Sequence, residues 1–260
     1  MINMIRAERY RLTKTKGFYI FWILILTLIA VDVLTNSVGG IGLGMGIPEG
    51  VTYSKDIMFL STNMNFYFFL LMPVFSIVIG EFTNNIVKNT ISSAVSKSRY
   101  FIYKYIICMV YGVLVFLFSN FLFYGLRMII HPANDPNGAF DVFVSRMMSQ
   151  LPLIIALLSV FIMVAFLLRK GAAYNSALML TPFLFMLVVG ILGEIPGVKD
   201  SNLLLKLEKY ELSQTFMHLG IRDTILDFSN FYRNVLIICA VATIGSFLIG
   251  YYTFKKRELQ

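Results

Sequence analysis

Charged side chains are scarce in this sequence: Asp, Glu, Lys and Arg make up only 14% of its 260 residues, whereas 58% of the residues are hydrophobic. An average globular domain is about one quarter charged and about one half apolar. A water-soluble domain of this length could not bury so much apolar surface. The composition therefore excludes an ordinary soluble protein and indicates a chain for which lipid is part of the solvent.

Cysteine and histidine are almost absent. Cys108 and Cys239 both lie inside apolar runs, which favours two small buried side chains over a disulfide or a metal pair. His131 and His218 are the only histidines, they lie far apart in the sequence, and no H-E-x-x-H motif occurs. We therefore expect no metal site.

Motifs for covalent chemistry are missing as well. No G-x-x-x-x-G-K-[ST] motif occurs, and the glycine-rich stretch 39–50 follows an apolar run, which favours a flexible loop or a bent helix end over a nucleotide site. Asp32 is the only acidic candidate within the apolar runs, so the acidic relay of a proton-coupled pump is not evident. We expect a non-catalytic chain without a cofactor of its own, and without a cleavable signal peptide.

What the sequence does contain is a series of long runs without charge. A membrane-spanning helix needs about 20 apolar residues, and five uncharged runs are 21 to 24 residues long. A sixth, shorter run extends past Asp32 if that side chain lies near the headgroups. The prediction is an all-α integral membrane protein with one domain over 1–260, whose six spans cover about 17–35, 57–80, 102–127, 147–168, 171–193 and 231–254.

The distribution of charge predicts the orientation of these spans. With the N-terminus inside, the inner segments hold 14 basic and three acidic residues, and the outer segments hold eight basic and eleven acidic residues. Lys and Arg favour the cytoplasmic side, so both termini and residues 81–104 are expected in the cytoplasm. The net charge of +8 is then a topology signal, and nucleic acid is not needed as a partner.

Prolines inside the apolar runs predict bends. Pro73, Pro152 and Pro182 each lie within an expected span. Proline lacks the N–H that a helix carbonyl would accept, so it kinks a helix and frees a carbonyl.

The polar stretch "GEFTNNIVKNTISSAVSKSRY", residues 80–100, interrupts the apolar runs. Its apolar residues recur at helical spacing, and Asn, Ser and Lys occupy the other positions, which predicts an amphipathic helix over 82–97. Such a helix either rests on the inner headgroups or docks on a soluble partner. The residues alone leave both possibilities open.

A spaced motif runs through this stretch: Glu81-Phe82, Lys88-Asn89, Ile91-Ser92, Ser96-Lys97 and Lys104. It resembles the first cytoplasmic loop of type-2 ABC exporter permeases, in particular the six-span kind found with bacterial peptide export and lantibiotic self-immunity. Three positions depart from that pattern, namely Ile86 in place of Thr, Ala94 in place of Gly or Pro, and Lys97 in place of Arg. Arg99 compensates for the last departure.

The resemblance implies a permease whose coupling segment, 81–99, binds a separate ABC ATPase that holds ATP and Mg. The residues implied in coupling are Glu81, Phe82, Lys88, Asn89, Ile91, Ser96, Lys97 and Arg99. It further implies a homodimer or a related heterodimer with spans two and five at the seam, in the bacterial cytoplasmic membrane. The implied activity is export of a hydrophobic or amphipathic substrate such as a peptide, toxin or lantibiotic. An ATP-independent channel or carrier, or a non-transporting scaffold or sensor, remains the alternative.

Two flanking segments complete the expected plan. Residues 1–16 combine apolar positions with five basic residues and predict an interfacial elbow helix before the first span. The loop 194–230 is far longer than a connection between neighbouring helices needs. Its apolar spacing predicts two short extracellular helices that cap the exit.

Overall fold

A computed structural model describes residues 2–35, 65–84, 86–92, 95–130, 136–193, 215, 219 and 228–256. Within these ranges the chain is helical, with no strand. The elements are α1 (Ile2–Lys14), α2 (Lys16–Thr35), α3 (Asn65–Val74), the π-helix η3 (Phe75–Ile79), α4 (Gly80–Thr83), α5 (Ile86–Ser92), α6 (Lys97–Ile130), α7 (Pro136–Leu168), α8 (Gly171–Gly193) and α11 (Phe228–Lys256).

Three helices of the described residues are long and apolar enough to cross a membrane: α6, α7 and α11. The bent pair of α1 and α2, which meet at 69°, would make a fourth. The all-helical class is therefore confirmed for the described residues, and three or four helices that could span a membrane agree with the predicted membrane protein. The full count of six spans stays a prediction, although α8 has the bounds expected for the fifth span and α3 with η3 fills the second half of the expected second span. The expected capping helices of 194–230 fall almost entirely outside the described residues.

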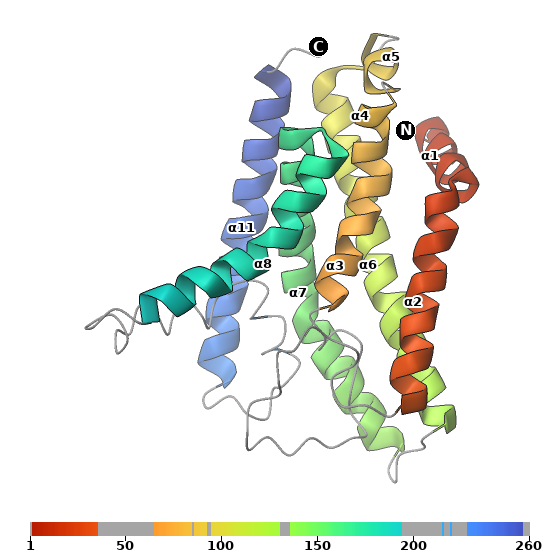
Figure 1. The fold of residues 1–260 in the computed structure, drawn as a ribbon, viewed down its shortest axis with the longest axis vertical. Helices are drawn as coiled ribbons and strands as arrows, with labels where there is room; N and C mark the ends of the chain where they lie inside the picture. The colour runs from red at the N-terminus through yellow and green to blue at the C-terminus, as the bar shows by residue number, and fades with distance from the viewer. Residues whose placement is uncertain are drawn as a thin grey trace.

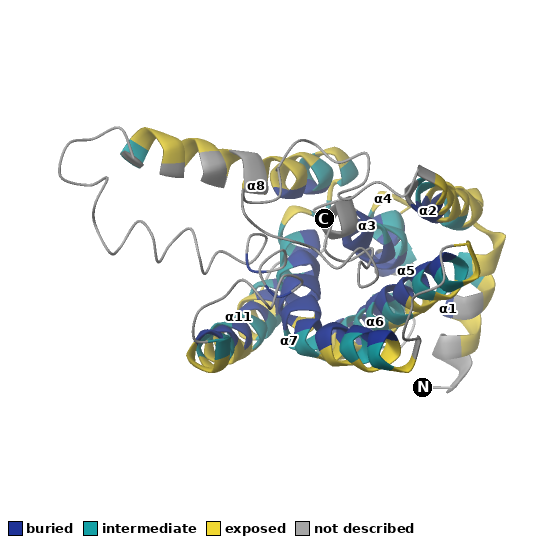
Figure 2. Cartoon of the chain, turned by 90° about the horizontal axis from the view of Figure 1, so that it is seen from below, coloured by how far each residue is buried: buried dark blue, intermediate teal, exposed yellow. Residues whose placement is uncertain are grey.

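The bundle is built around α7. Helix α11 packs along one side of α7 and α6 along another, while α2 packs on α6 (Figure 1). Helix α3 and η3 contact α6 and α7, so the dark-blue buried faces of α3, α6 and α7 turn toward one another (Figure 2). Helix α8 leans away from this bundle along its length, and its apolar side chains Leu184, Leu187 and Ile191 are exposed.

Small residues allow the helices to approach closely. A Cβ on Gly112 would lie 2.5 Å from Leu158 Cδ1, so α6 touches α7 there. A Cβ on Gly250 would lie 3.2 Å from the Phe101 ring and 3.4 Å from Met163 Cα. In lipid, such packing replaces the hydrophobic effect as the force between helices.

A polar link joins the three central helices. Tyr105 of α6 shares a hydrogen bond of 2.9 Å with Ser159 of α7, whose hydroxyl donates to the Thr243 carbonyl of α11 at 3.1 Å. Polar contacts of this kind hold membrane helices in register, because an unpaired hydroxyl is costly in hydrocarbon.

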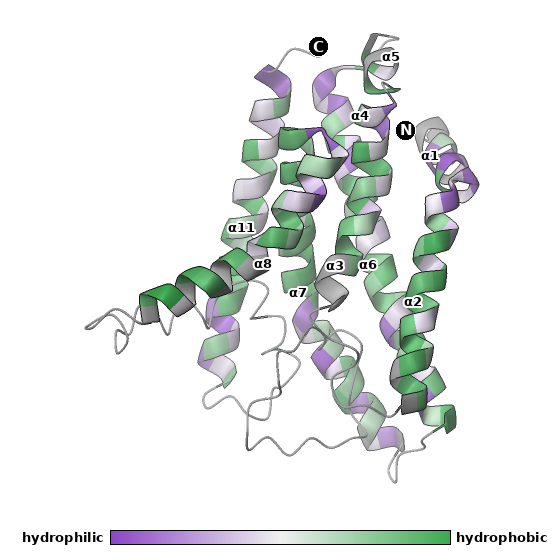
Figure 3. Cartoon of the chain, in the orientation of Figure 1, coloured by the Kyte–Doolittle hydropathy of each residue, from purple (hydrophilic) through white to green (hydrophobic). Residues whose placement is uncertain are grey.

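Hydrophilic residues gather toward the ends of the helices (Figure 3). Helices α1, α4 and α5 lie at one end of the bundle, together with the start of α6, the end of α11 and the turn between α7 and α8 (Figure 1). The segments that the charge count assigns to one side of a membrane therefore occupy one end of the molecule.

Candidate functional site

The polar segment 81–99 is not one continuous helix, so the expected helix over 82–97 is wrong in its extent. Helix α4 ends at Thr83, because the backbone of Asn84 leaves the helical conformation with φ −93° and ψ 10°, and the side-chain amide of Asn84 donates to the Gly80 carbonyl at 2.8 Å. A new helix, α6, begins after Ser96, whose Oγ accepts the Arg99 N–H at 3.4 Å. Between these two helices, the described residues Ile86–Ser92 form the separate helix α5.

Helix α5 packs on the bundle through the apolar side chains that the sequence predicts for its inner side. Val87 is buried, and Ile91 is half-buried and packs against the core. The backbone of Lys88 and Asn89 lies on this helix, but their side chains are outside the described residues. Thus α5 rests on the bundle through an apolar side.

The other expected coupling residues divide into two groups. Ser96 and Arg99 are exposed, and Lys97 is half-buried at the first position of α6. Ser96 serves as the N-cap of that helix. Glu81 and Phe82, by contrast, enter the bundle and contact elements far away in the sequence.

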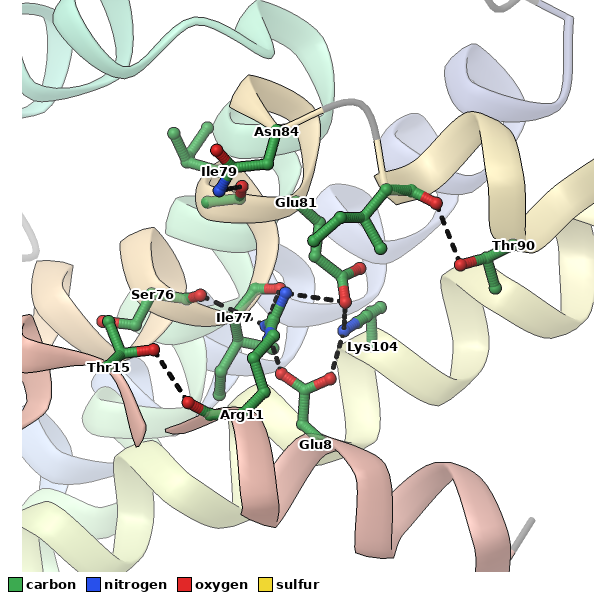
Figure 4. Close-up of polar contacts among 12 residues, drawn as sticks. Glu8, Arg11, Thr15, Ser76, Ile77, Ile79, Glu81, Asn84, Thr90 and Lys104 are labelled. Atoms are coloured by element: carbon green, nitrogen blue, oxygen red, sulfur yellow. Dashed lines mark hydrogen bonds and ion pairs between the residues drawn. The ribbon is translucent and has the colours of Figure 1, made fainter. Parts of the chain in front are cut away.

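Glu81 belongs to a network of four charged side chains (Figure 4). Its Oε1 accepts from Arg11 Nη1 of α1 at 2.7 Å and from Lys104 Nζ of α6 at 2.8 Å. Lys104 Nζ also lies 2.6 Å from Glu8 Oε2, and Glu8 pairs with Arg11. We call Glu8, Arg11, Glu81 and Lys104 the ion quartet.

The ion quartet is buried and electrically balanced. Lys104 is 1% exposed, Glu8 5% and Glu81 6%, whereas the Arg11 side chain is 25% exposed. Removing an ion from water costs several kcal/mol, which mutual attraction repays only when each ion has good partners. Here each carboxylate has two cations and each cation has two carboxylates, so the arrangement closes on itself.

Neutral groups add to this network. The Tyr100 hydroxyl donates to Glu81 Oε2. The ammonium of Lys104 lies 5.8 Å from the ring centres of both Tyr100 and Tyr103, a separation at which a cation is attracted to the face of the ring. The quartet is therefore enclosed by aromatic rings on the side of α6.

Phe82 anchors the same segment on its other side. Its ring lies edge-to-face on Phe166 of α7, with 5.7 Å between centroids, and on Phe254 of α11, at 6.3 Å. The Arg169 guanidinium lies 5.6 Å from the Phe82 ring centre and 5.8 Å from that of Phe254. Arg169 has φ 58°, which lets the chain reverse from α7 into α8 within two residues.

Sequence reasoning missed the ion quartet because it treated Glu8 only as one charge in a count and Glu81 as a contact residue. One signal was present. Glu8 and Glu81 are each the only acidic residue in a strongly basic segment, 1–16 and 81–104 respectively. A lone acid among basic residues indicates a specific pairing, but its partner cannot be read from the sequence.

Comparisons with known proteins do not place the chain in a family. No family model matches it, and no curated protein matches it. In the described part of the chain, no three His, Cys, Asp or Glu side chains converge as metal ligands would. The ion quartet, the aromatic contacts of Phe82 and the short helix α5 are the features of the described residues that bear on function.

Proposed function

We propose that this chain is the membrane-spanning permease subunit of an ATP-driven ABC exporter, and that α5 is where a separate ATPase subunit binds. One observation carries the proposal: α5 is a short helix outside the long apolar helices, and Glu81 and Phe82, a few residues before it, are held in the bundle by ion pairs and aromatic contacts. A short helix that follows residues fixed in the bundle is suited to pass a displacement from a bound partner to the membrane helices.

The two residues Glu81 and Phe82 make contacts in two directions. Glu81 contacts α1 and α6, and Phe82 contacts α7, α11 and the turn at Arg169. A partner that moves α5 when it binds ATP therefore acts on four helices and on the turn at Arg169 at once. If α5 only rested on lipid headgroups, it would need neither the buried ion pairs of Glu81 nor the aromatic contacts of Phe82.

The rest of the assembly follows from the same proposal. Both termini and α5 face the cytoplasm of a bacterial cell, in accord with the charge distribution. ATP and Mg are held by the partner, and two permeases, identical or related, form the transmembrane unit. The exposed apolar side chains of α8 support the part of the seam that span five would form.

The proposed substrate is hydrophobic or amphipathic, and a peptide of the toxin or lantibiotic kind is the first to test. The support is the resemblance of the 81–104 motif to permeases of peptide export. Reconstituted complex should show ATPase activity that rises with the exported peptide in a panel of peptides, lipids and drugs. Transport that proceeds without ATP would instead establish a channel or carrier.

The decisive experiment reverses charge on α5 and at the start of α6. Tagged chain is purified from its native membranes in mild detergent, and bound proteins are tested for an ABC ATPase without membrane spans. We expect Lys88→Glu with Lys97→Glu to lower ATPase recovery or transport per ATP by about tenfold or more, because charged interface contacts are specific and strong.

The matched control is Lys256→Glu, which reverses an exposed charge at the same end of the bundle. It should retain wild-type ATPase recovery. Wild-type recovery and transport in the Lys88→Glu, Lys97→Glu variant would refute ATPase docking at α5 and favour a headgroup anchor.

A further inference from the structure

The backbone just before α4 departs from α-helical geometry. Pro73 lies inside α3 and supplies no N–H, and residues Phe75–Ile79 form a π-helix in which the Gly80 N–H bonds to the Phe75 carbonyl. A π-helical turn is rare and often occurs at functional sites. This wide turn, η3, connects the expected second span to Glu81 and the coupling segment.

Side chains from α1 and α8 contact η3 and the end of α3 from two sides. Arg11 of α1 donates from Nη2 to the Ser76 carbonyl at 3.2 Å and to the Ile77 carbonyl at 3.1 Å. On the other side, the Tyr174 ring of α8 lies 6.3 Å from the Phe75 ring of η3 between centroids, and its hydroxyl donates to the carbonyl of Leu71 in α3, before the turn, at 3.3 Å. Backbone carbonyls carry two lone pairs, so each can accept such a bond in addition to its helix bond.

Arg11 does more than balance charge. Its Nη1 bonds Glu81, while its Nη2 bonds Glu8 and the two carbonyls of η3 (Figure 4). Four acceptors on three segments thus share one planar guanidinium. A lysine carries the same charge on a single nitrogen and cannot span this set of acceptors.

We propose that Arg11 is a positioning residue that fixes the π-helical turn η3 to α1. In this proposal, η3 is the hinge of the coupling segment 81–99, and α1 sets the position of η3. The use of the hinge in transport rests on the proposed function. The hinge itself does not, because it is inferred from the π-helical geometry of η3 and from the contacts of Arg11 with Ser76, Ile77 and Glu81.

Hydrogen–deuterium exchange, read by mass spectrometry on the purified full chain in detergent, tests the hinge without any ATPase. Arg11→Lys keeps the charge balance and removes the fork of donors. We expect amide exchange over residues 75–84 to accelerate by about tenfold or more, because hydrogen bonds to a charged donor are the strong ones. Exchange in α7 should stay at the wild-type rate.

A control variant with two substitutions distinguishes the effect of the Arg11 hydrogen bonds from the effect of the other charges in the ion quartet. Glu8→Gln with Lys104→Met removes one anion and one cation from the ion quartet but leaves Arg11, Glu81 and both carbonyl bonds. It should keep exchange over 75–84 within about twofold of wild type. Equal acceleration in this pair and in Arg11→Lys would overturn the proposal, because the network as a whole would then hold the turn. Wild-type exchange in Arg11→Lys would also overturn it.

A second readout addresses the role in coupling. In complex with its ATPase, Arg11→Lys should hydrolyse ATP but move less substrate per ATP, and Arg6→Lys, an exposed position on the same helix, should not. If no ATPase binds the chain at all, the proposed function fails, and the exchange result still decides the hinge.

Discussion

At the scale of single residues, the ion quartet makes Lys104 the most consequential charge in the described part of the chain. Lys104→Met would leave Glu8 and Glu81 with only Arg11 between them, and an uncompensated buried charge costs about 3–5 kcal/mol. We expect a large loss of thermal stability in detergent, measured by unfolding of the purified chain.

Adding Glu8→Gln to Lys104→Met should recover roughly half of that loss or more, because the remaining pair of Arg11 and Glu81 is again neutral. A double variant less stable than Lys104→Met alone would contradict the charge-balance account. The test is a double-mutant cycle, so the result does not depend on the absolute stability of either variant.

The residue scale is also where sequence reasoning reached least far. Glu81 and Phe82 were predicted as coupling residues, but the pairing of Glu81 with Arg11 and Lys104 joins positions 70 and 23 residues away. Helical periodicity reports which side of its own helix a residue occupies. It carries no information on which distant side chain completes a buried charge, because that depends on how α1, α4 and α6 pack.

At the scale of elements, the close approach of α6 and α7 at Gly112 gives a direct test of packing. Gly112→Ala would place a Cβ 2.5 Å from Leu158 Cδ1 and 3.1 Å from its Cγ. Leu158 is fully buried and has little room to move, so we expect a loss of about 1–3 kcal/mol.

Gly125 of the same helix is the matched control, because a Cβ there would meet nothing within 4 Å. Gly125→Ala should be neutral or stabilising by up to about 1 kcal/mol, since glycine is a poor helix former. Thermal unfolding of both variants decides the matter. Equal effects at the two positions would show that helix propensity, and not contact with α7, governs Gly112.

The elements also show which parts of the fold a sequence can predict. Helices α6, α7 and α11 could be predicted because a long uncharged run is a local property that lipid selects directly. The helix expected over 82–97 was too long because its apolar spacing continues through positions where polar side chains bond the backbone. Asn84 closes one helix and Ser96 opens the next, and these bonds compete with the helix ladder.

At the scale of the whole molecule, α5, the end of α11 and the turn at Arg169 lie at the same end of the bundle (Figure 1). This arrangement predicts that they face the same side of the membrane. Cysteine placed at exposed Asn137 should react with a membrane-impermeant maleimide in intact cells, and cysteine at exposed Lys256 should react only after the cells are opened.

The native thiols do not interfere with this test, since Cys108 and Cys239 are both buried. Labelling of position 256 from outside, with protection of position 137, would reverse the orientation and remove α5 from the reach of a cytoplasmic ATPase.

The ion quartet also sets an order of assembly during synthesis. Arg11 leaves the ribosome 93 residues before Lys104, a delay on the order of 5–20 s at bacterial and eukaryotic elongation rates. Throughout that interval Glu8 and Arg11 lack their partner on α6, and a charged helix of this kind stays in the aqueous interface. The first helix to be made therefore cannot complete its buried ion pairs until the start of α6 has been made, and a chain truncated before Lys104 would leave Glu8 and Glu81 with Arg11 as their only cation in the quartet.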